Sequence, residues 1–416
     1  MIPQKLPSTK KTYQAILLGT LLVFFSCKNF EKGKGISEVI LMDVDYLEKT
    51  KKLLKNKDPK LTPAYNQLME EAEAALKESP FSVTDKKKLP PSKDKHDYAS
   101  YSRYWWPDPN KPDGLPYIRR DGETNPNSQS LDYSDRQRLG AFGFNTETLG
   151  LAYYFTGKEK YAKKAAELLR IWFLNEETKM NPNVNHAQIR TGHNQGTKSG
   201  VLDGRLTIGA FEGALLIANS SALSNEEQKK LKDWAAAYFK WLTTSKLALK
   251  EAASKNNHGS FYDVQAMYFA LYSGNKEAAA QIAQKFILQR LYSQIKPDGS
   301  MPEEMARTRP LFYSIYNLHA MFLVANLAKK VHVDVWEIDK EDSRLRAGLE
   351  YLIPYTDPNK QWPHSTIGDT DRMKMFPLLQ MADNIYQNQN YLKQADVISL
   401  EKRKIQRSNL AFPTIR

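Results

Sequence analysis

Residues 151–175 read LAYYFTGKEKYAKKAAELLRIWFLN, an aromatic-rich segment, a glycine, a charged pair and an alanine-rich segment. The second half places apolar residues at i, i+3, i+4 and i+7, one face of an amphipathic helix formed by Ala165, Leu168, Leu169 and Trp172. A glycine that closes one helix and charge that opens the next are typical of helix ends. The stretch therefore predicts two helices that form a hairpin around Gly157.

The same pattern recurs in MYFALYSGNKEAAAQIAQKF, residues 267–286. Further helical periodicity covers residues 42–56, 62–78, 204–219, 225–246, 260–273, 276–293, 311–330 and 372–390. No alternating run is long enough to indicate a sheet. Repeated hairpins curve into a solenoid or close into a ring. We expect an all-α fold, an α/α toroid made as an incomplete barrel of helical hairpins, in a single domain over residues 41–416.

The N-terminus has the layout of an export signal. Lys10 and Lys11 precede the apolar run AILLGTLLVFFSC, which ends at Cys27 and is too short for a stable membrane span. Cys27 is the single cysteine, so an intrachain disulfide is impossible. Its place after Ser26 is typical of a bacterial lipoprotein, and an incidental cysteine in an ordinary signal peptide or anchor is the alternative. We expect a signal peptide with a lipoprotein cysteine at 1–27 and a tether at 28–40.

Export fits a periplasmic protein or an outer-membrane lipoprotein, with membrane contact only through the lipid anchor. The formal charge of +13 falls to +10 when residues 1–26 are removed, because Lys5, Lys10 and Lys11 leave and no acid does. A basic exported protein is expected to bind an anion. No nucleic-acid motif is present, so we expect no nucleic acid, and acidic polysaccharide is the more available polyanion. Solvated lysine runs are the alternative explanation of the charge.

Three long irregular segments interrupt the helices at 80–135, 177–203 and 294–310, and such loops are usually functional. The first offers Arg103, Tyr104 and Trp105, which suit stacking on sugar rings and pairing with carboxylates, although aromatic residues also pin loops to a fold. The second is polar and suits the lining of a cleft. Its candidate residues are His186, Arg190 and His193.

In the third segment, Arg307 and Arg309 precede a helix on which Tyr313 and Tyr316 share a face. A nearby cation stabilises a phenolate, so a tyrosine on this face is expected to have a lowered pKa and to act as a base. Packing with a satisfied hydroxyl is the alternative for any one tyrosine. A further polar cluster, SKNNHGSFYDVQ at 254–265, sets Asn257 and His258 where a helix begins, with Asn256 or a neighbour as its cap.

Several chemistries lack their motifs. The seven histidines form no HExxH pair and the lone cysteine excludes thiolate clusters, so we expect no metal and no cofactor. A GxSxG elbow and a phosphate-binding glycine loop are also missing from the sequence. A glycosidase would need two carboxylates. Acids such as Asp203, Asp263 and Glu304 lie in or near loops, but acids are too common for their positions to identify a catalytic pair.

The Asn257-His258-Gly sequence, with Arg309 and Tyr316 seven residues apart, resembles the alginate lyase domain of helical-toroid polysaccharide lyases. The stretches YWWPDPNKPDGLPYIRRDGETNP and NPNVNHAQIRTGHNQG are similar to the substrate-cleft loops of exported, Bacteroidetes-type members. The resemblance covers roughly residues 60–385. It implies that 4-linked uronate chains are cleaved by β-elimination, with alginate, polymannuronate or glucuronan as substrate.

The same resemblance implies a role for each matching residue. Asn257 and His258 would neutralise the uronate carboxylate with help from Arg309, and Tyr316 would be base and acid. Further residues implied to bind substrate are Arg307, Tyr313, His193 in preference to His186, and His364, for which packing beside Trp362 is equally expected. Gly259 is interpreted as letting a sugar approach the backbone. The rival hypotheses are a non-catalytic, lipid-anchored glycan-binding protein and an α/α-toroid glycoside hydrolase.

Overall fold

The computed structural model of the protein describes residues 39–338, 343–387 and 390–413. The predicted signal peptide, Cys27 and tether residues 28–38 lie outside the described residues. The last two tether residues, Val39 and Ile40, are described. Val39 is buried, and the backbone N–H of Ile40 donates to the Glu212 carboxylate at 3.0 Å. The folded domain therefore already includes Val39.

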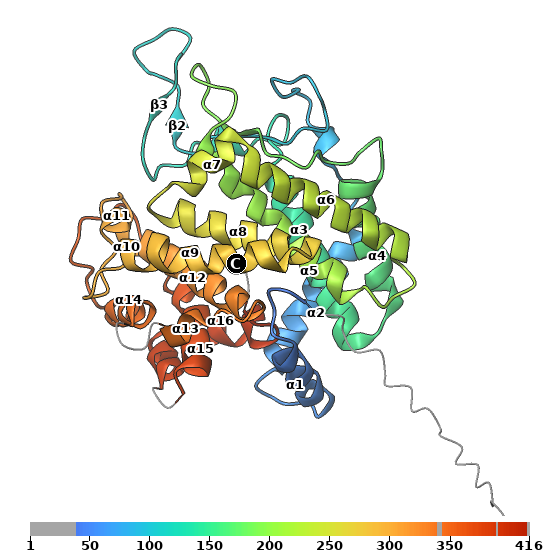
Figure 1. Ribbon diagram of the computed structural model, residues 1–416, viewed down its shortest axis with the longest axis vertical. Coiled ribbons are helices and arrows are strands. Elements are labelled where there is room, and N and C mark those ends of the chain that lie inside the picture. Colours follow the sequence, from blue (N-terminus) through green and yellow to red (C-terminus); the bar gives the residue numbers. More distant parts are fainter. Residues whose placement is uncertain (1–38, 339–342, 388–389, 414–416) are drawn as a thin grey trace, which may run out of the picture. The chain divides into compact units, whose positions relative to one another are not determined.

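Helices dominate the described chain (Figure 1). They are α1 (Val44–Lys55), α2 (Thr62–Lys77), α3 (Arg136–Thr156), α4 (Glu159–Leu169), α5 (Ile208–Leu216), α6 (Asn225–Thr244), α7 (Lys246–Ala252), α8 (Asn257–Ser273), α9 (Lys276–Phe286), α10 (Tyr292–Gln294), α11 (Pro302–Met305), α12 (Pro310–Lys329), α13 (Val335–Ile338), α14 (Arg344–Leu352), α15 (Met375–Ile385) and α16 (Leu400–Lys404). The strands are β1 (Ala99–Tyr101), β2 (Trp105–Trp106), β3 (Ile118–Arg119) and β4 (His186–Ile189).

The two predicted hairpins are confirmed as α3–α4 and α8–α9. Gly157 and Gly274 close their first helices with φ of 68° and 88°, the left-handed conformation that glycine adopts without strain. The likeness of the two hairpins extends further than the sequence indicated. Each second helix widens into a five-residue π-helical turn, at Arg170–Leu174 and at Ile287–Leu291.

The hairpins form an α/α toroid, which confirms the predicted fold class. Inner helices are buried around most of their circumference: α3 packs on α5, and α8 packs on α12. Amphipathic helices cover them, with α4 on α3, both α6 and α9 on α8, and α14 on α12 (Figure 1). By length and composition α12 could cross a membrane, but 78% of its apolar window is buried inside the protein, as in a core helix.

The described residues form four short strands, where the sequence indicated none. β1 pairs in parallel with β4, which joins the first long loop to the second. β2 pairs antiparallel with β3, so that Trp105 lies opposite Arg119 within the first loop. Each strand has only two to four residues, too few for an alternating pattern to be read from sequence. The β1–β4 pairing holds the first and second loops against each other, and the β2–β3 pairing folds the first loop back on itself.

Candidate active site

A cavity of about 440 Å³ is lined by all three long loops, by the first turn of α8 and by the first two turns of α12. It brings together most of the residues that the sequence singled out. The predicted site residues that line it are Arg103, Tyr104, Trp105, Arg190, Asn257, His258, Arg307, Tyr313 and Tyr316. We call this cavity the cleft.

The start of α8 places two of these residues. Asn256 caps the helix, because its side-chain oxygen accepts a hydrogen bond from the backbone N–H of His258 at 3.2 Å. The capping role predicted for Asn256 is confirmed. Asn257 and His258 therefore occupy the first helical turn, directly at the cleft.

Asn257 is bound to a buried carboxylate, Glu304 of α11. The Asn257 side-chain Nδ2 donates to Oε1 and Oε2 of Glu304 at 3.0 and 2.8 Å, and its backbone N–H donates to the same group. Glu304 is 0% exposed and Asn257 is 1% exposed. Burial raises the pKa of Glu304 to about 7, against the opposing effects of the Asn257 hydrogen bonds and of Arg307 and His258.

His258 is bound to a second buried carboxylate, Glu251 of α7. A short hydrogen bond joins Nδ1 of His258 to Oε1 of Glu251, whose side chain is 1% exposed. The pair fixes the plane of the imidazole ring. Since Nδ1 is taken by Glu251, Nε2 is the ring nitrogen left for a ligand in the cleft.

Tyr316 is held by a residue that sequence reasoning missed. Nε of Arg205 donates a hydrogen bond to the Tyr316 hydroxyl oxygen at 2.9 Å. The Tyr316 ring packs against Phe261, at 4.3 Å between ring centres, and stacks on Phe312. Arg205 lies in a 3-10 segment, Lys198–Thr207, with no motif around it, so only the fold reveals its pairing with α12.

Tyr313 has a different environment from Tyr316. Its hydroxyl bonds to that of Tyr104 at 2.9 Å and accepts from the Arg307 guanidinium at 2.9 Å. The pKa of Tyr313 is raised, chiefly by burial and then by Tyr104, and the charge of Arg307 does not offset this. The expected lowering of the pKa by neighbouring arginines is therefore wrong for Tyr313.

Four other predicted site residues are not among the residues that line the cleft. Arg309 donates to the backbone oxygen of Asp369 at 2.7 Å, and its guanidinium lies 5.1 Å from the ring of the cleft residue Phe312. His193 is exposed, and its ring lies 4.8 Å from that of Trp105. His186 bonds to the backbone oxygen of Gln195, and His364 lies 5.3 Å from Trp362.

The charge of the cleft is one-sided. Eight cations line it, namely Arg103, Arg119, Arg136, Arg190, Lys198, Arg205, Arg307 and Lys374, and no carboxylate of the described residues does. Arg119 and Arg307 pair with Asp121, and Arg136 pairs with Asp203. The other five have no acidic partner within the part of the chain that the structure describes. The cleft is therefore suited to a polyanion.

Asp121 joins two of these arginines across the cleft wall. Burial alone would raise the pKa of Asp121, but the hydrogen bonds and charges of Arg307 and Arg119 outweigh burial and lower it to about 2. Thr308 also donates to this carboxylate, at 3.1 Å. The first loop is thus bound to the start of α12.

The interpretation of Gly259 was wrong. A Cβ at this position would meet the backbone oxygen of Ser254 at 2.2 Å and Cζ of Arg290 at 2.9 Å. Arg290 in turn pairs with the buried Asp263 at 2.9 Å. Gly259 therefore allows close packing beneath the cleft and does not face a sugar.

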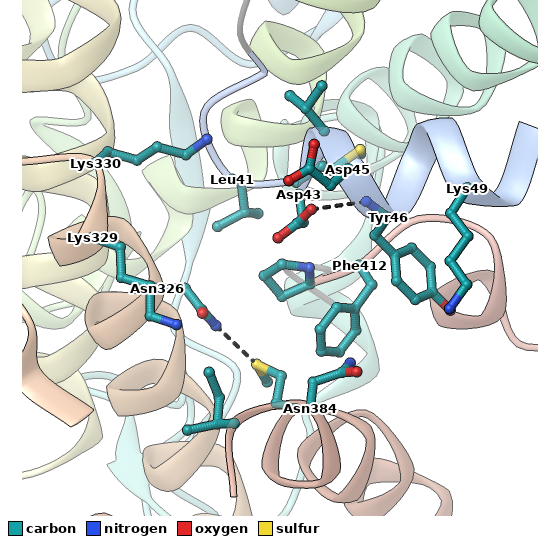
Figure 2. Close-up of a pocket in the computed structure, with 15 residues that line it drawn as sticks. Leu41, Asp43, Asp45, Tyr46, Lys49, Asn326, Lys329, Lys330, Asn384 and Phe412 are labelled. Carbon is teal, nitrogen blue, oxygen red and sulfur yellow. Dashed lines mark hydrogen bonds between the residues drawn. The ribbon is translucent and has the colours of Figure 1, made fainter. Parts of the chain in front are cut away.

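A larger cavity, of about 550 Å³, lies between α1, α12, α15 and residues 412–413 (Figure 2). Its lining mixes Asp43 and Asp45 with Lys49, Lys329 and Lys330. Figure 2 shows Asp43 accepting from the Tyr46 backbone N–H at 2.8 Å, which is a helix cap. This cavity has no concentration of one charge. No group of three histidine, cysteine or acidic residues that could hold a metal occurs among the described residues.

A helical toroid whose cleft presents a tyrosine, a histidine and an asparagine among cations defines a polysaccharide lyase of the α/α-toroid class. The family model for alginate lyase matches residues 82–362. A crystal structure of an alginate lyase from Bacteroides ovatus is similar, with 38% identity and a TM-score of 0.85, over 90% of this chain and 99% of that one. The chain belongs to the alginate lyase family.

A more distant likeness concerns the fold alone. The alginate lyase A1-III from a Sphingomonas species has 15% identity and a TM-score of 0.56, over 88% of this chain and 95% of that one. A variant of alginate lyase A1-III complexed with a tetrasaccharide has 13% identity and a TM-score of 0.57, over 92% and 98%. A comparison with curated proteins finds no match.

Proposed function

We propose that the protein cleaves 4-linked uronate chains, in mannuronate-rich alginate, polymannuronate or glucuronan, by β-elimination. One observation carries the proposal: the Tyr316 hydroxyl, held by Arg205, shares with Asn257 and His258 a cleft that is lined by eight cations and by no carboxylate of the described residues. The likeness to an alginate lyase of Bacteroides ovatus supports a uronate substrate.

The reaction breaks the C5–H bond and the bond from C4 to the glycosidic oxygen, and forms a C4=C5 double bond. Removal of the C5 proton is feasible only if the developing enolate dianion is stabilised. Deprotonated Tyr316 would take the C5 proton and pass it to the leaving oxygen. For manno- or gluco-configured uronates these two groups are on the same side, so one tyrosine serves both transfers in a syn elimination.

The carboxylate of the reacting sugar needs cationic and hydrogen-bonding partners. His258 offers Nε2, because Glu251 holds Nδ1. We assign Arg309 the role of assisting His258 at the carboxylate, because its position in the sequence matches the family pattern. Arg205 offers a second guanidinium, which already donates to the Tyr316 hydroxyl. Arg205 also fixes the direction of that hydroxyl, because the oxygen accepts from Nε and its remaining lone pair and hydrogen must point elsewhere.

Two rival functions make different demands on the cleft. A glycoside hydrolase needs a pair of carboxylates at the scissile bond, and none of the described acids lines the cleft. A non-catalytic glycan-binding protein would use Trp105 and the cations, but has no use for a tyrosine hydroxyl fixed in the same cleft as a histidine–carboxylate pair. The lyase hypothesis explains both features.

The proposal is tested by incubating the mature protein with polymannuronate, mixed alginate and glucuronan, and by measuring the ultraviolet absorbance of the C4=C5 double bond that cleavage creates. A rise on at least one glycan is expected. Tyr316→Phe should abolish turnover, by roughly 1,000-fold or more, while binding is largely kept. Folded protein that gives no signal on any acidic glycan contradicts the proposal. Reducing ends that appear without the chromophore would indicate the hydrolase, and binding without cleavage the binding protein.

For location, we propose an exported lipoprotein, in the periplasm or on the outer membrane, anchored at Cys27. The support is the sequence pattern of Lys10, Lys11 and the apolar run before Cys27. Labelling with a radioactive fatty acid in the native host is expected to mark the wild-type chain, and Cys27→Ser is expected to stay unlabelled. A labelled Cys27→Ser chain would contradict the assignment.

A further inference from the structure

A second, smaller cavity borders the cleft. Its volume is about 120 Å³, which leaves room for one sugar ring. Ser102 and Trp105 line both cavities, so the two are neighbours across the first loop. The other lining residues, which the proposed mechanism does not use, include Lys88, Tyr101, Tyr117, Asn127 and Tyr133. We call this cavity the side pocket.

Aromatic rings form much of the wall of the side pocket. They belong to Tyr101, Trp105, Tyr117 and Tyr133. Tyr101 and Tyr133 pack edge to face, at 4.9 Å between ring centres. A sugar ring presents C–H bonds on its faces and hydroxyls around its rim, so it suits a pocket that combines aromatic surface with polar groups.

Two of the tyrosines keep their hydroxyls available to a ligand. The Tyr133 hydroxyl donates to the backbone oxygen of Asn127. The hydroxyls of Tyr101 and Tyr117, by contrast, bond to no residue within the described parts of the chain. A tyrosine that only pins a loop usually satisfies its hydroxyl, whereas each of these two can both donate to a ligand and accept from it.

Lys88 gives the side pocket a single positive charge. Its ammonium lies 5.6 Å from the ring centre of Tyr101. None of the acids in the described residues lines the side pocket. The neighbouring Lys87 does not line it and pairs instead with Asp132 at 3.0 Å. One uronate residue carries one carboxylate, so the charge of Lys88 matches that of one such residue.

Trp105 is a fixed wall between the two cavities. Its backbone oxygen accepts from Nδ2 of Asn125 at 2.8 Å. The guanidinium of Arg190 lies 4.7 Å from the Trp105 ring centre, and Arg190 lines the cleft but not the side pocket, so it covers the ring from the cleft side. His193 packs on the same ring and bonds to the backbone oxygen of Tyr117 at 2.7 Å. The side pocket is therefore already formed before a ligand arrives.

We propose that the side pocket is a further substrate subsite, which binds one uronate residue of a chain whose reacting sugar lies at Tyr316 in the cleft. The chain crosses the edge of Trp105 to reach it. This inference deepens the proposed function and rests on it, because it says where a longer chain is held. Long chains then bind more tightly than short ones.

The experiment uses saturated oligomers of whichever glycan gives the ultraviolet signal, mannuronate or glucuronate, up to the octasaccharide. Titration calorimetry into Tyr316→Phe protein, which is expected to bind without turnover, gives the affinity at each length. Adding Tyr117→Ala should weaken binding of the longest oligomers roughly tenfold, as loss of one aromatic contact typically does, and leave the shortest oligomer that binds unaffected. Adding Lys88→Ala should weaken the longest oligomers about two- to fivefold, and the matched control Lys87→Ala should change nothing.

Trp106→Ala controls for a general disturbance of the first loop, since Trp106 lies in the same β2–β3 hairpin and lines neither cavity. Any effect of that change should be equal on short and long oligomers. An equal loss on short and long oligomers from Tyr117→Ala, or no loss, overturns the inference. Should Tyr117→Ala not fold, Lys88→Ala decides by the same criterion.

The result also separates this inference from the proposed function. If the native protein gives the ultraviolet product and the side-pocket variants show no dependence on chain length, the inference fails and the lyase proposal stands. If the native protein gives no product and binds no acidic oligomer of any length, the proposed function fails and the inference with it.

Discussion

Nε of Arg205 donates to the hydroxyl oxygen of Tyr316 at 2.9 Å, across 111 residues of sequence. The same guanidinium lies 5.3 Å from the ring centre of Phe261, which itself packs on the Tyr316 ring. Arg205 thus fixes both the ring and the hydroxyl of the tyrosine that the proposed mechanism uses. A cation at this oxygen also favours the negative charge that the oxygen carries in the reaction.

Arg205→Ala is expected to lower kcat by roughly 100-fold, as loss of one preorganised donor at a reacting oxygen typically does, with a smaller change in KM. Arg205→Lys should recover part of the rate, because an ammonium can still donate to Tyr316. The measurement is initial rates by ultraviolet absorbance on polymannuronate. Arg103→Ala serves as the control: Arg103 lines the cleft without touching Tyr316, so KM should rise while kcat stays within about threefold. A normal kcat for Arg205→Ala would refute this role.

Tyr313 and Tyr316 should respond very differently to the loss of their hydroxyls. Burial raises the pKa of Tyr313, and its hydroxyl is engaged by Tyr104 and Arg307, so it is a poor base. Tyr313→Phe is expected to reduce kcat by less than about tenfold, mainly through the disturbed position of Arg307, whereas Tyr316→Phe abolishes turnover. Single-turnover rates on one substrate compare the two. A Tyr313→Phe protein as inactive as Tyr316→Phe would show that the base has been misassigned.

The fold could be predicted from sequence because the outer helices are amphipathic. The face made by Ala165, Leu168 and Trp172 is buried against α3, as its spacing indicated. The inner helices have no polar face to set a period. α3 begins at Arg136, whereas the sequence pattern indicated only its last part, from residue 151. The helix buries Asn145, Thr146 and Glu147 along with its apolar residues. Such a helix has no amphipathic signature to detect.

Part of the site could be predicted from sequence, because some of its residues belong to a local sequence pattern and others do not. Asn257 and His258 begin α8, Tyr316 lies in the second turn of α12 seven residues after Arg309, and all three line the cleft. The residues that orient them could not be found. Glu304 and Glu251 are single acids among 47, and their importance comes from burial behind the cleft, which only the packing of α7, α8 and α11 creates.

Asp121→Asn is expected to weaken the fold in a way that depends on pH. The folded-state pKa of Asp121 is about 2, below its ordinary value of 3.8, so the carboxylate contributes stability above pH 4 that is lost as pH falls toward 2. At pH 6 the variant should be less stable by roughly 1–2 kcal/mol, after allowing for partial exposure of the group. Urea unfolding at pH 6 and pH 3 measures this, and the difference between variant and native protein should shrink at the lower pH. A constant difference would mean that Asp121 acts through packing and not through charge.

Gly259→Ala is expected to destabilise the protein by about 1–3 kcal/mol, because its Cβ would meet the Ser254 backbone oxygen at 2.2 Å and Cζ of Arg290 at 2.9 Å. The clash lies directly beneath Asn257 and His258, so kcat should fall as well. Gly140→Ala is the matched control, since a Cβ there meets nothing within 4 Å and the residue lies inside α3. Alanine at a helical position of this kind should be neutral or stabilise by up to about 1 kcal/mol. Thermal unfolding and initial rates on polymannuronate test both variants. A Gly259→Ala protein of normal stability and rate would show that the residues packed under the cleft can shift to accommodate the added Cβ.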